Sequence, residues 1–433
     1  MLCHFVRAAA LSALALPFAS ADVPGAGYGL DSTTLLPGFT TLAAHDTLSN
    51  GNRVVYDGSQ IWIESASGTF LQLLDNPTSN QWLGFVEVDP TETFAVFGET
   101  TQGRLFRVPL TGGTSTPITV LQNAYDLAFE STTSALVSAA VCDSGFTVCT
   151  NFLYRVDLVT GATQVLASVD GPSGPIAITP NGDVLIGTLP TAFSIPPDSC
   201  SLLKFSASQV ASGPFPLTEL DAVTFTPNLD GAASMAVDSV TGHVFLAESL
   251  VFGTSNLLEI DRFGAVVGPV ASTSDYLTKV EILDAPGAGG LAAFQPAGRQ
   301  LKYRTTNFSS PISSTITTVS PRRPVLTSVQ NGNGTLTCTL TGGQPNSAAF
   351  VISGTTSAYN PTESPFALGQ YVLWTGMPYP NVRRAGIQFA LDASGTGSFT
   401  FNNPAPIQGQ FVLQALVRDS SGVFRGASTA AFN

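Results

Sequence analysis

Short stretches of alternating apolar and polar residues, separated by Gly, Pro and Asn turns, run through most of this sequence. The stretch 85–122 shows the pattern most clearly, because its apolar runs are separated by Asp89-Pro90, Gln102-Gly103 and Gly112-Gly113. Alternation with a period of two predicts half-buried strands, and Pro ends a strand because it cannot donate into a ladder. This region is therefore expected to form four short strands joined by three turns.

Four strands in about 40 residues is the size of one β-propeller blade, and the same pattern recurs between residues 53 and 319. The third strand of each repeat starts about 45 to 55 residues after the previous one, as propeller blades do; these starts lie near Arg104, Phe152, Leu202, Leu257 and Leu301. The count predicts an all-β fold with a six-bladed β-propeller at 53–319. A seven-bladed propeller is the alternative. Residues 22–52 are a lead-in, in which a strand near 38–44 would help to close the ring.

Three phrases within these repeats resemble known propellers. They are LYRVDLVTGA at 153–162, ITPNGDVLIGT at 178–188 and AVDSVTGHVFLAES at 236–249. They are similar to phrases of exported bacterial six-bladed propellers of the NHL, SMP-30/gluconolactonase and YVTN-like class. The resemblance implies a fold, because such phrases mark blade geometry and fold does not establish function. In gluconolactonase-like enzymes, a divalent metal lies on the axis, held by acids and Asn from different blades.

The pattern changes after residue 319. Residues 320–324 read SPRRP and predict a linker, and 325–433 contain alternating strands with Gly-rich turns. About 110 residues of this kind fit an immunoglobulin-like β-sandwich. The phrases GTLTCTLTGGQPNSAAFVISG, LDASGTGSFTF and GQFVLQALVRDSSG are similar to a C-terminal module of secreted planctomycete proteins. That resemblance implies a surface or export-related accessory domain without catalysis.

Composition and the first residues bear on where the protein works. Charged residues make up 11% of the 433, and the net charge is −13, which argues against nucleic acid and anionic membranes as partners. Residues 1–21 have the basic Arg7, an apolar run and Ala19-Ser20-Ala21, which predict a signal peptide cleaved after Ala21. No other run is long enough for a membrane helix. We expect a secreted, periplasmic or cell-surface protein without a membrane span, and a monomer.

Export permits disulfides. Cys142 and Cys149 are close enough in sequence to close a hairpin loop, and they are predicted to be bonded. Cys200 and Cys338 fall in different predicted domains and are expected to be unpaired.

The usual catalytic motifs are absent from the sequence, which has no GxSxG, HExxH, P-loop or GxGxxG. Only two histidines follow residue 21, His45 and His243, and both are expected at the surface. The sequence therefore favours a protein that is not an enzyme.

One ring of polar residues is a candidate site. The residues that close the second strand of each predicted blade are Glu64, Glu99, Ala140, Thr188, Glu248 and Gln295. Since equivalent positions of a propeller lie on a ring, Glu64, Glu99 and Glu248 could hold a divalent cation (Ca2+ or Zn2+). The simpler interpretation, solvated strand ends, stays open.

The loops after these strands lengthen in three consecutive blades, and each loop carries a Phe: Phe146, Phe193 and Phe252. Long loops on one rim of a rigid scaffold often bind ligands. Each Phe could equally cover its own loop.

Two functions follow. The first is an exported ligand-binding or interaction protein that uses one propeller face to hold an unknown extracellular ligand or cell-surface component. The alternative is a divalent-metal-dependent lactonase or hydrolase of the SMP-30/gluconolactonase type, acting at the propeller axis.

Overall fold

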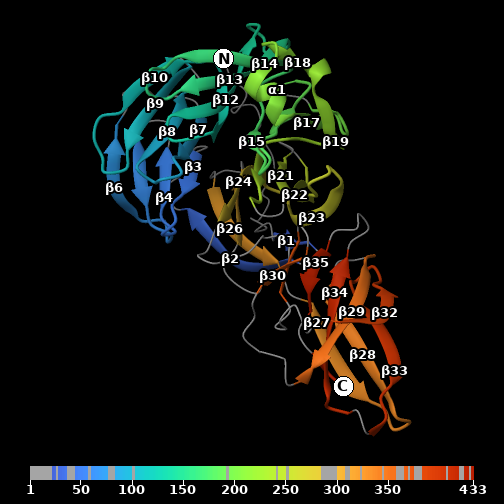
Figure 1. The fold of residues 1–433 in the computed structure, drawn as a ribbon. Helices are drawn as coiled ribbons and strands as arrows, with labels where there is room; N and C mark the ends of the chain where they lie inside the picture. The colour runs from blue at the N-terminus through green and yellow to red at the C-terminus, as the bar shows by residue number, and fades with distance from the viewer. Residues whose placement is uncertain are drawn as a thin grey trace, which may run out of the picture.

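The regular secondary structure of the described residues is almost all β-strand (Figure 1). The computed structural model describes residues 22–25, 28–36, 44–56, 60–76, 83–99, 103–191, 195–239, 242–249, 253–283, 300–307, 313–321, 324–343, 346–356, 365–368, 371–374, 383–405, 408–418, 424–428 and 431–433. The predicted signal peptide lies outside these residues. Among the described residues, no helix has the length and apolar character needed to cross a membrane.

Six sheets fill the N-terminal part of the chain, up to residue 321. The first three contain, in turn, β3 (Ala44–Thr47), β4 (Arg53–Tyr56), β5 (Ile61–Glu64) and β6 (Phe70–Asp75); β7 (Leu83–Val88), β8 (Phe94–Glu99), β9 (Arg104–Pro109) and β10 (Thr116–Val120); and β11 (Ala124–Phe129), β12 (Ser134–Cys142), β13 (Cys149–Asp157), β14 (Thr163–Asp170) and β18 (Leu217–Thr218).

The next three sheets follow the same order from the inner to the outer strand. They contain β15 (Ile176–Ile178), β16 (Val184–Thr188), β17 (Cys200–Phe205) and β19 (Val223–Leu229); β20 (Ser234–Val237), β21 (Val244–Glu248), β22 (Ser255–Ile260), β23 (Val266–Thr273) and β1 (Val23–Pro24); and β24 (Tyr276–Leu283), β25 (Gln300–Asn307), β26 (Ser313–Pro321) and β2 (Tyr28–Leu36). A short helix, α1 (Ala207–Ser212), and a 3-10 turn, η2 (Glu219–Asp221), connect β17 to β19.

The sheets stand around a ring and form a β-propeller (Figure 1). Their inner strands touch in the order β3, β7, β11, β15, β20 and β24, and β24 returns to β3. Apolar side chains fill the spaces between neighbouring sheets. Phe85 and Leu127 pack together between the second and third sheets, and Leu185 and Leu246 between the fourth and fifth. Each sheet thus buries both faces against its neighbours, which leaves the inner strands to line the axis.

Acids at the ends of inner strands make the turns. In the second sheet, the Asp89 carboxylate accepts hydrogen bonds from the backbone N–H groups of Thr93 (2.6 Å) and Phe94 (2.8 Å). Side-chain bonds to the backbone are how Asp directs a turn, so Asp89 holds the hairpin between β7 and β8.

The lead-in supplies strands at both sides of the ring closure. Its strand β3 is the innermost strand of the first sheet, and its strand β2 pairs with β26 in the last, from Tyr28 opposite Pro321 to Leu36 opposite Ser314. A strand of the lead-in thus contributes to the ring closure, at 44–47; residues 38–43 lie outside the described residues.

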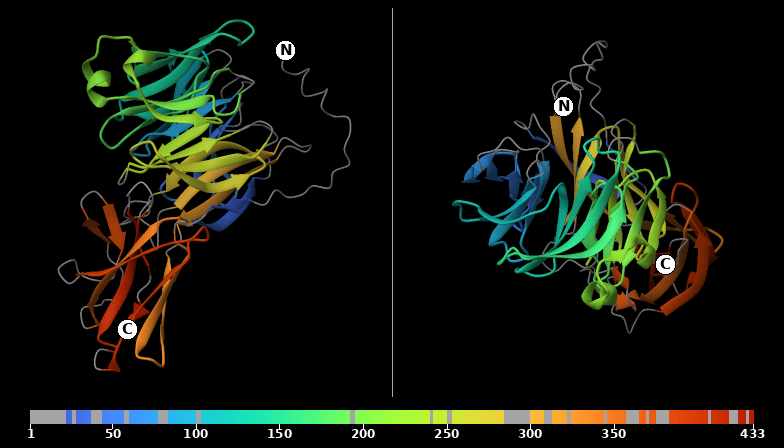
Figure 2. Two further views of the ribbon diagram at one scale, coloured as in Figure 1. Left: turned by 90° about the vertical axis from the view of Figure 1, so that its right-hand side faces the viewer. Right: turned by 90° about the horizontal axis from the view of Figure 1, so that it is seen from above.

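The C-terminal part forms separate sheets beside the ring (Figure 2). One contains β27 (Val325–Gln330), β28 (Thr335–Thr341) and β33 (Gly397–Asn402); a second contains β32 (Arg383–Ala390), β29 (Ala348–Thr355), β34 (Phe411–Arg418), β35 (Phe424–Ala427) and β36 (Ala431–Phe432); β30 (Pro365–Leu368) and β31 (Tyr371–Trp374) form a hairpin. Leu336 and Leu340 of the first sheet share one core with Val351 and Ala415 of the second.

Candidate functional site at the propeller axis

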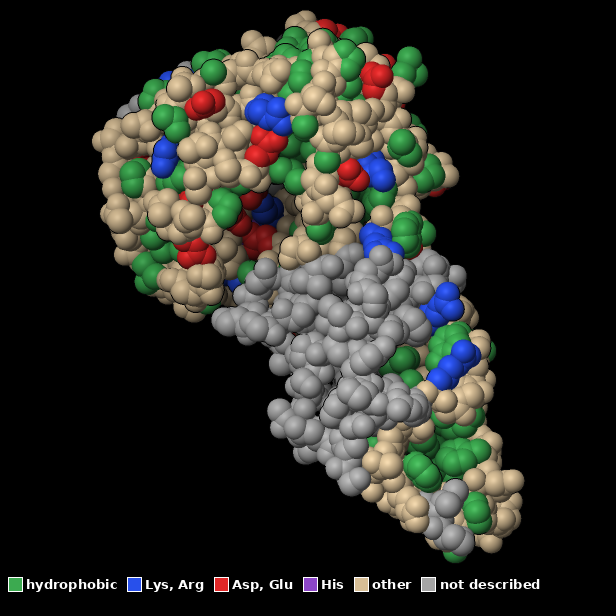
Figure 3. All heavy atoms as spheres, in the orientation of Figure 1, with side chains coloured by type: hydrophobic (Ala, Val, Ile, Leu, Met, Phe, Trp, Pro, Cys, Tyr) green, Lys and Arg blue, Asp and Glu red, His purple; other side chains and the backbone are tan. Residues whose placement is uncertain are grey.

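Charged side chains gather at the axis of the ring. Figure 3 shows acidic and basic side chains inside a hollow in the middle of the propeller. The inner strands explain them, since β3, β7, β11 and β24 carry acids or a lysine among apolar residues; these are Asp46, Glu87, Asp126, Lys279 and Glu281. A charged side chain inside a buried strand needs an opposite charge or hydrogen bonds, and these side chains have both.

Lys279 and Glu87 form an ion pair across the ring, from β24 to β7. Their side chains are 20% and 16% exposed, so the pair is in contact with solvent while largely enclosed. Burial disfavours the ammonium, but Glu87, Asp46 and Asp126 together raise the pKa of Lys279. Lys279 therefore stays charged. We call Asp46, Glu87, Asp126, Lys279 and Glu281 the axial group, of which Lys279 is the cation.

Asp46 and Asp126 both hold the next inner strand in place. The Asp46 carboxylate accepts from the backbone N–H of Val88 in β7 (2.6 Å), and Asp126 accepts from that of Ile176 in β15 (2.9 Å). Ser234 accepts from Val280 in β24 in the same way (3.1 Å). This repeated contact between successive sheets gives the two acids a structural role in the ring.

Burial nevertheless favours the protonated form of the Asp46 and Asp126 carboxyls. Burial and the nearby Glu281, opposed by Lys279, raise the pKa of Asp46 to about 7. Burial, again opposed by Lys279, raises the pKa of Asp126 to about 6. Burial raises the pKa of Glu87 well above its usual range despite Lys279. Carboxyls that titrate near neutral pH are suited to general acid–base catalysis.

His45, Thr47 and Glu281 meet where the first and last sheets join. Thr47 Oγ1 donates to Glu281 Oε2 (2.6 Å), and His45 Nε2 lies 3.6 Å from the same oxygen. Burial lowers the pKa of His45, although the nearby Glu281 opposes the shift. Although burial opposes it, His45 and Lys279 lower the pKa of Glu281, which is ionised. Two buried atoms, His45 Nδ1 and Glu281 Oε1, have no hydrogen-bond partner among the described residues.

The surface positions predicted for the two histidines are wrong. His45 is 4% exposed and His243 is 1% exposed. Each is buried beside a carboxylate, and His243 Nδ1 lies 2.9 Å from Glu259 Oε1. The sequence did contain a signal for the axial group, because a charged residue inside an apolar inner strand has to face polar surroundings. Glu87, Asp126 and Glu281 have that pattern, whereas Asp46 stands between His45 and Thr47 in β3.

The predicted ring of strand ends is not a set of equivalent positions. Glu64 closes β5, the third strand of its sheet, whereas Glu99, Thr188 and Glu248 close second strands. The reason is that β3, from the lead-in, precedes the strand that the sequence pattern counted first. Glu64 is 1% exposed and pairs with Arg53, with Nη2 2.8 Å from Oε2.

The other members of that ring have partners of their own or lie outside the described residues. Thr188 Oγ1 donates to the backbone oxygen of Ser201 (3.1 Å), and Glu248 accepts from the backbone N–H of Asp230 (2.8 Å). Gln295 and the side chain of Glu99 lie outside the described residues. The metal site at Glu64, Glu99 and Glu248 stays a prediction.

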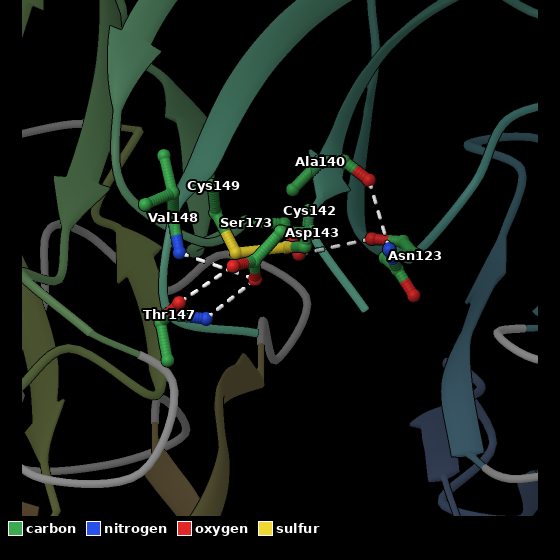
Figure 4. Close-up of a disulfide and its surroundings, with 8 residues drawn as sticks. All are labelled: Asn123, Ala140, Cys142, Asp143, Thr147, Val148, Cys149 and Ser173. Atoms are coloured by element: carbon green, nitrogen blue, oxygen red, sulfur yellow. Dashed lines mark hydrogen bonds between the residues drawn. A yellow bond between two sulfur atoms is a disulfide. The ribbon is translucent and has the colours of Figure 1, made fainter. Parts of the chain in front are cut away.

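The rim loop of the third sheet is closed by the disulfide that the spacing predicted (Figure 4). Cys142 and Cys149 are bonded at 2.02 Å, and Asp143 inside the loop accepts from the Thr147 backbone N–H (2.7 Å). Phe146 lies in this loop and is 41% exposed. Phe193 and Phe252 lie outside the described residues. Cys200 and Cys338 are unpaired, as predicted.

The donor set at the axis does not suit a divalent ion. Within the described ranges, no three His, Cys, Asp or Glu side chains come together as a metal site. The axial carboxyls instead act together on the Lys279 ammonium, which pairs with Glu87, and the oxygens of Asp46 and Asp126 accept backbone hydrogen bonds. The described residues are thus arranged for hydrogen-bonded charges.

Comparisons with known proteins find similar folds at low identity. A gluconolactonase from Xanthomonas campestris has a TM-score of 0.47 and 14% identity, covering 69% of this chain and 97% of that one. The PQQ domain of pyranose dehydrogenase from Coprinopsis cinerea has 0.44 and 8%, covering 69% and 97%. A luciferin-regenerating enzyme has 0.44 and 11%, covering 67% and 95%.

No protein-family model and no curated protein matches the chain. Since the TM-scores of these similar structures are 0.47 or less, they assign no activity to it.

Proposed function

We propose that this protein is an exported six-bladed β-propeller enzyme that hydrolyses a small ester or lactone at its axis. One observation carries the proposal: Asp46, whose pKa is raised by burial to about 7, is one of the charged side chains of the inner strands and interacts electrostatically with the Lys279 ammonium. The six sheets are its blades, and the two C-terminal sheets are an immunoglobulin-like sandwich that serves attachment or spacing. This proposal takes the hydrolase alternative from the sequence and places it on different residues.

The chemistry needs one base and one cation. Asp46 takes a proton from water as the water oxygen bonds to the carbonyl carbon. Lys279 stabilises the negative charge that forms on the carbonyl oxygen, as fixed charges do in enclosed sites. The bond from carbon to the leaving oxygen then breaks, and Asp46 returns its proton to that oxygen. Glu87 holds Lys279 in position through their ion pair.

A hydrolysis assay with matched variants tests this function. The protein is assayed against γ- and δ-lactones and p-nitrophenyl esters, each with and without a primary amine on the acyl chain, as wild type, Asp46→Asn and Asp392→Asn. We expect Asp46→Asn to lower kcat by about 100-fold or more, as the loss of a general base does. The Asp392 carboxylate accepts a hydrogen bond from the Ser394 backbone N–H in an exposed turn. The control Asp392→Asn removes the same charge far from the axis and should leave kcat unchanged.

The pH profile gives an independent reading. Because Asp46 must be ionised to act as a base, kcat/KM should rise with pH through about 7. No hydrolysis of any of these compounds, or equal rates for wild type and Asp46→Asn, would end the proposal. The binding function at the rim would then be the better account, since Val141, Phe146 and Val148 are exposed around the disulfide loop.

A further inference from the structure

The axial group carries more carboxyls than cations. Asp46, Glu87, Asp126 and Glu281 all act electrostatically on Lys279. Glu87 takes the ion pair with this lysine, so the other three acids share an ammonium that is already engaged. Of the two basic side chains on β25, Arg304 donates to Ser314 (3.0 Å), and Lys302 interacts electrostatically with Glu281 without an ion pair between the two.

A second observation points to a ligand. Glu281 is 7% exposed, and its Oε1 has no hydrogen-bond partner among the described residues, whereas its Oε2 accepts from Thr47. A buried carboxylate oxygen without a donor costs free energy. A donor that enters the group from the axis would remove that cost, and a positively charged donor would also offset the excess of acids.

Aromatic side chains stand beside these acids. Tyr125 precedes Asp126 on β11, and its hydroxyl donates across the ring to the backbone oxygen of Ala233 (2.7 Å). Tyr276 of β24 is near enough to influence Tyr125 electrostatically. Faces of Tyr rings attract organic ammonium groups, and these two tyrosines lie on inner strands that also carry acids of the site.

These observations distinguish an ammonium group from a metal ion. A divalent ion needs several oxygens at about 2.0 to 2.5 Å around one point. The axial acids come from four strands, and the described residues contain no group of three that could hold a metal. An ammonium group donates hydrogen bonds that are longer, at about 2.8 Å, and that need less exact geometry.

We infer that the axial hollow binds a ligand that carries a primary ammonium group, with Asp126 and Glu281 as acceptors. This inference rests on the proposed function for the place of the site, and it names the substrate class as esters or lactones that bear an amine. Below neutral pH the incoming cation releases the proton that Asp126 holds, because burial raises the pKa of Asp126 to about 6. Affinity therefore rises with pH between about 5 and 7.

Titration calorimetry with n-butylammonium chloride tests the inference without turnover. Sodium butyrate, an anion of the same length, and sodium chloride serve as controls at equal ionic strength. We expect millimolar binding of butylammonium, as suits so small a ligand, and no heat from butyrate. Asp126→Asn should weaken binding about 10-fold, while Asp392→Asn leaves it unchanged. Circular dichroism checks that both variants fold.

Three results would overturn the inference: no butylammonium binding, butyrate binding equally well, or equal affinities for the Asp126→Asn and Asp392→Asn proteins. If Asp126→Asn does not fold, Glu281→Gln gives the same comparison. Amine binding by a protein that hydrolyses none of the esters supports the inference and ends the proposed function. Hydrolysis of an ester or lactone without amine binding would support the proposed function and overturn the inference.

Discussion

At the scale of single residues, Arg53 and Glu64 show how a charge can be structural. Both side chains are almost fully buried, and the Arg53 guanidinium also donates to the Ser65 backbone oxygen (2.9 Å). Such a pair is costly to break, because removing one partner leaves the other charge buried and alone. Glu64 is therefore expected to contribute to stability.

Replacing Glu64 measures that contribution. Glu64→Gln should lower the free energy of unfolding by about 3 to 5 kcal/mol, the usual range for a broken buried pair. The control is Glu130→Gln, which breaks the half-exposed pair with Arg155 and should cost about 1 kcal/mol or less. Both are measured by urea unfolding, and equal losses in the two variants would contradict a structural role for Arg53–Glu64.

At the scale of elements, the hairpin of β12 and β13 carries its own covalent closure. Cys142 and Cys149 are seven residues apart, so the bond closes a short loop. A loop of this size restricts the unfolded chain enough to add about 2 kcal/mol to stability. Both cysteines lie at the loop end of long strands that pair over their whole length.

Removing the bond tests this estimate. The double variant Cys142→Ser and Cys149→Ser should unfold with a free energy lower by about 2 kcal/mol. Wild type in reductant should approach the double variant, and reductant should not affect the variant, because Cys200 and Cys338 are unpaired and buried. A variant as stable as the oxidised wild type would show that the bond does not restrict the unfolded chain.

Individual strands could be predicted from the sequence more fully than the site. The runs at 94–98 and 104–108 became β8 and β9 because alternation and turn residues are local signals. Glu64 was wrongly predicted to close the second strand of its blade, because the innermost strand of that sheet, β3, is four residues long and mixed in polarity. The axial group could not be assembled in advance, since Glu87 and Lys279 are 192 residues apart and meet only when the ring closes.

At the scale of the whole molecule, the axial acids link stability to pH. An Asp in the unfolded chain titrates near 3.9, whereas Asp46 and Asp126 in the folded protein titrate near 7 and 6. Between these values the folded state binds protons that the unfolded state releases. Their contribution is therefore fully favourable below about pH 4 and is lost as pH rises to about 7.

Thermal unfolding at about pH 5 and about pH 8 tests this link. The Tm of wild type should be lower at about pH 8, by roughly 2 to 5 °C. Asp126→Asn, which cannot ionise, should show a smaller fall, and Asp392→Asn should match wild type. A fall in Asp126→Asn as large as that of wild type would remove Asp126 from the explanation.

The pairing of β2 with β26 has a consequence for the order of events during synthesis. The ribosome makes β2 early, yet its partner strand, which ends at Pro321, emerges almost 300 residues later. Until then β2 is an unpaired edge beside a growing, open stack of blades, which is the state most exposed to pairing with another chain. The last blade thus has to leave the ribosome before β2 can pair with β26 and is no longer available to another chain.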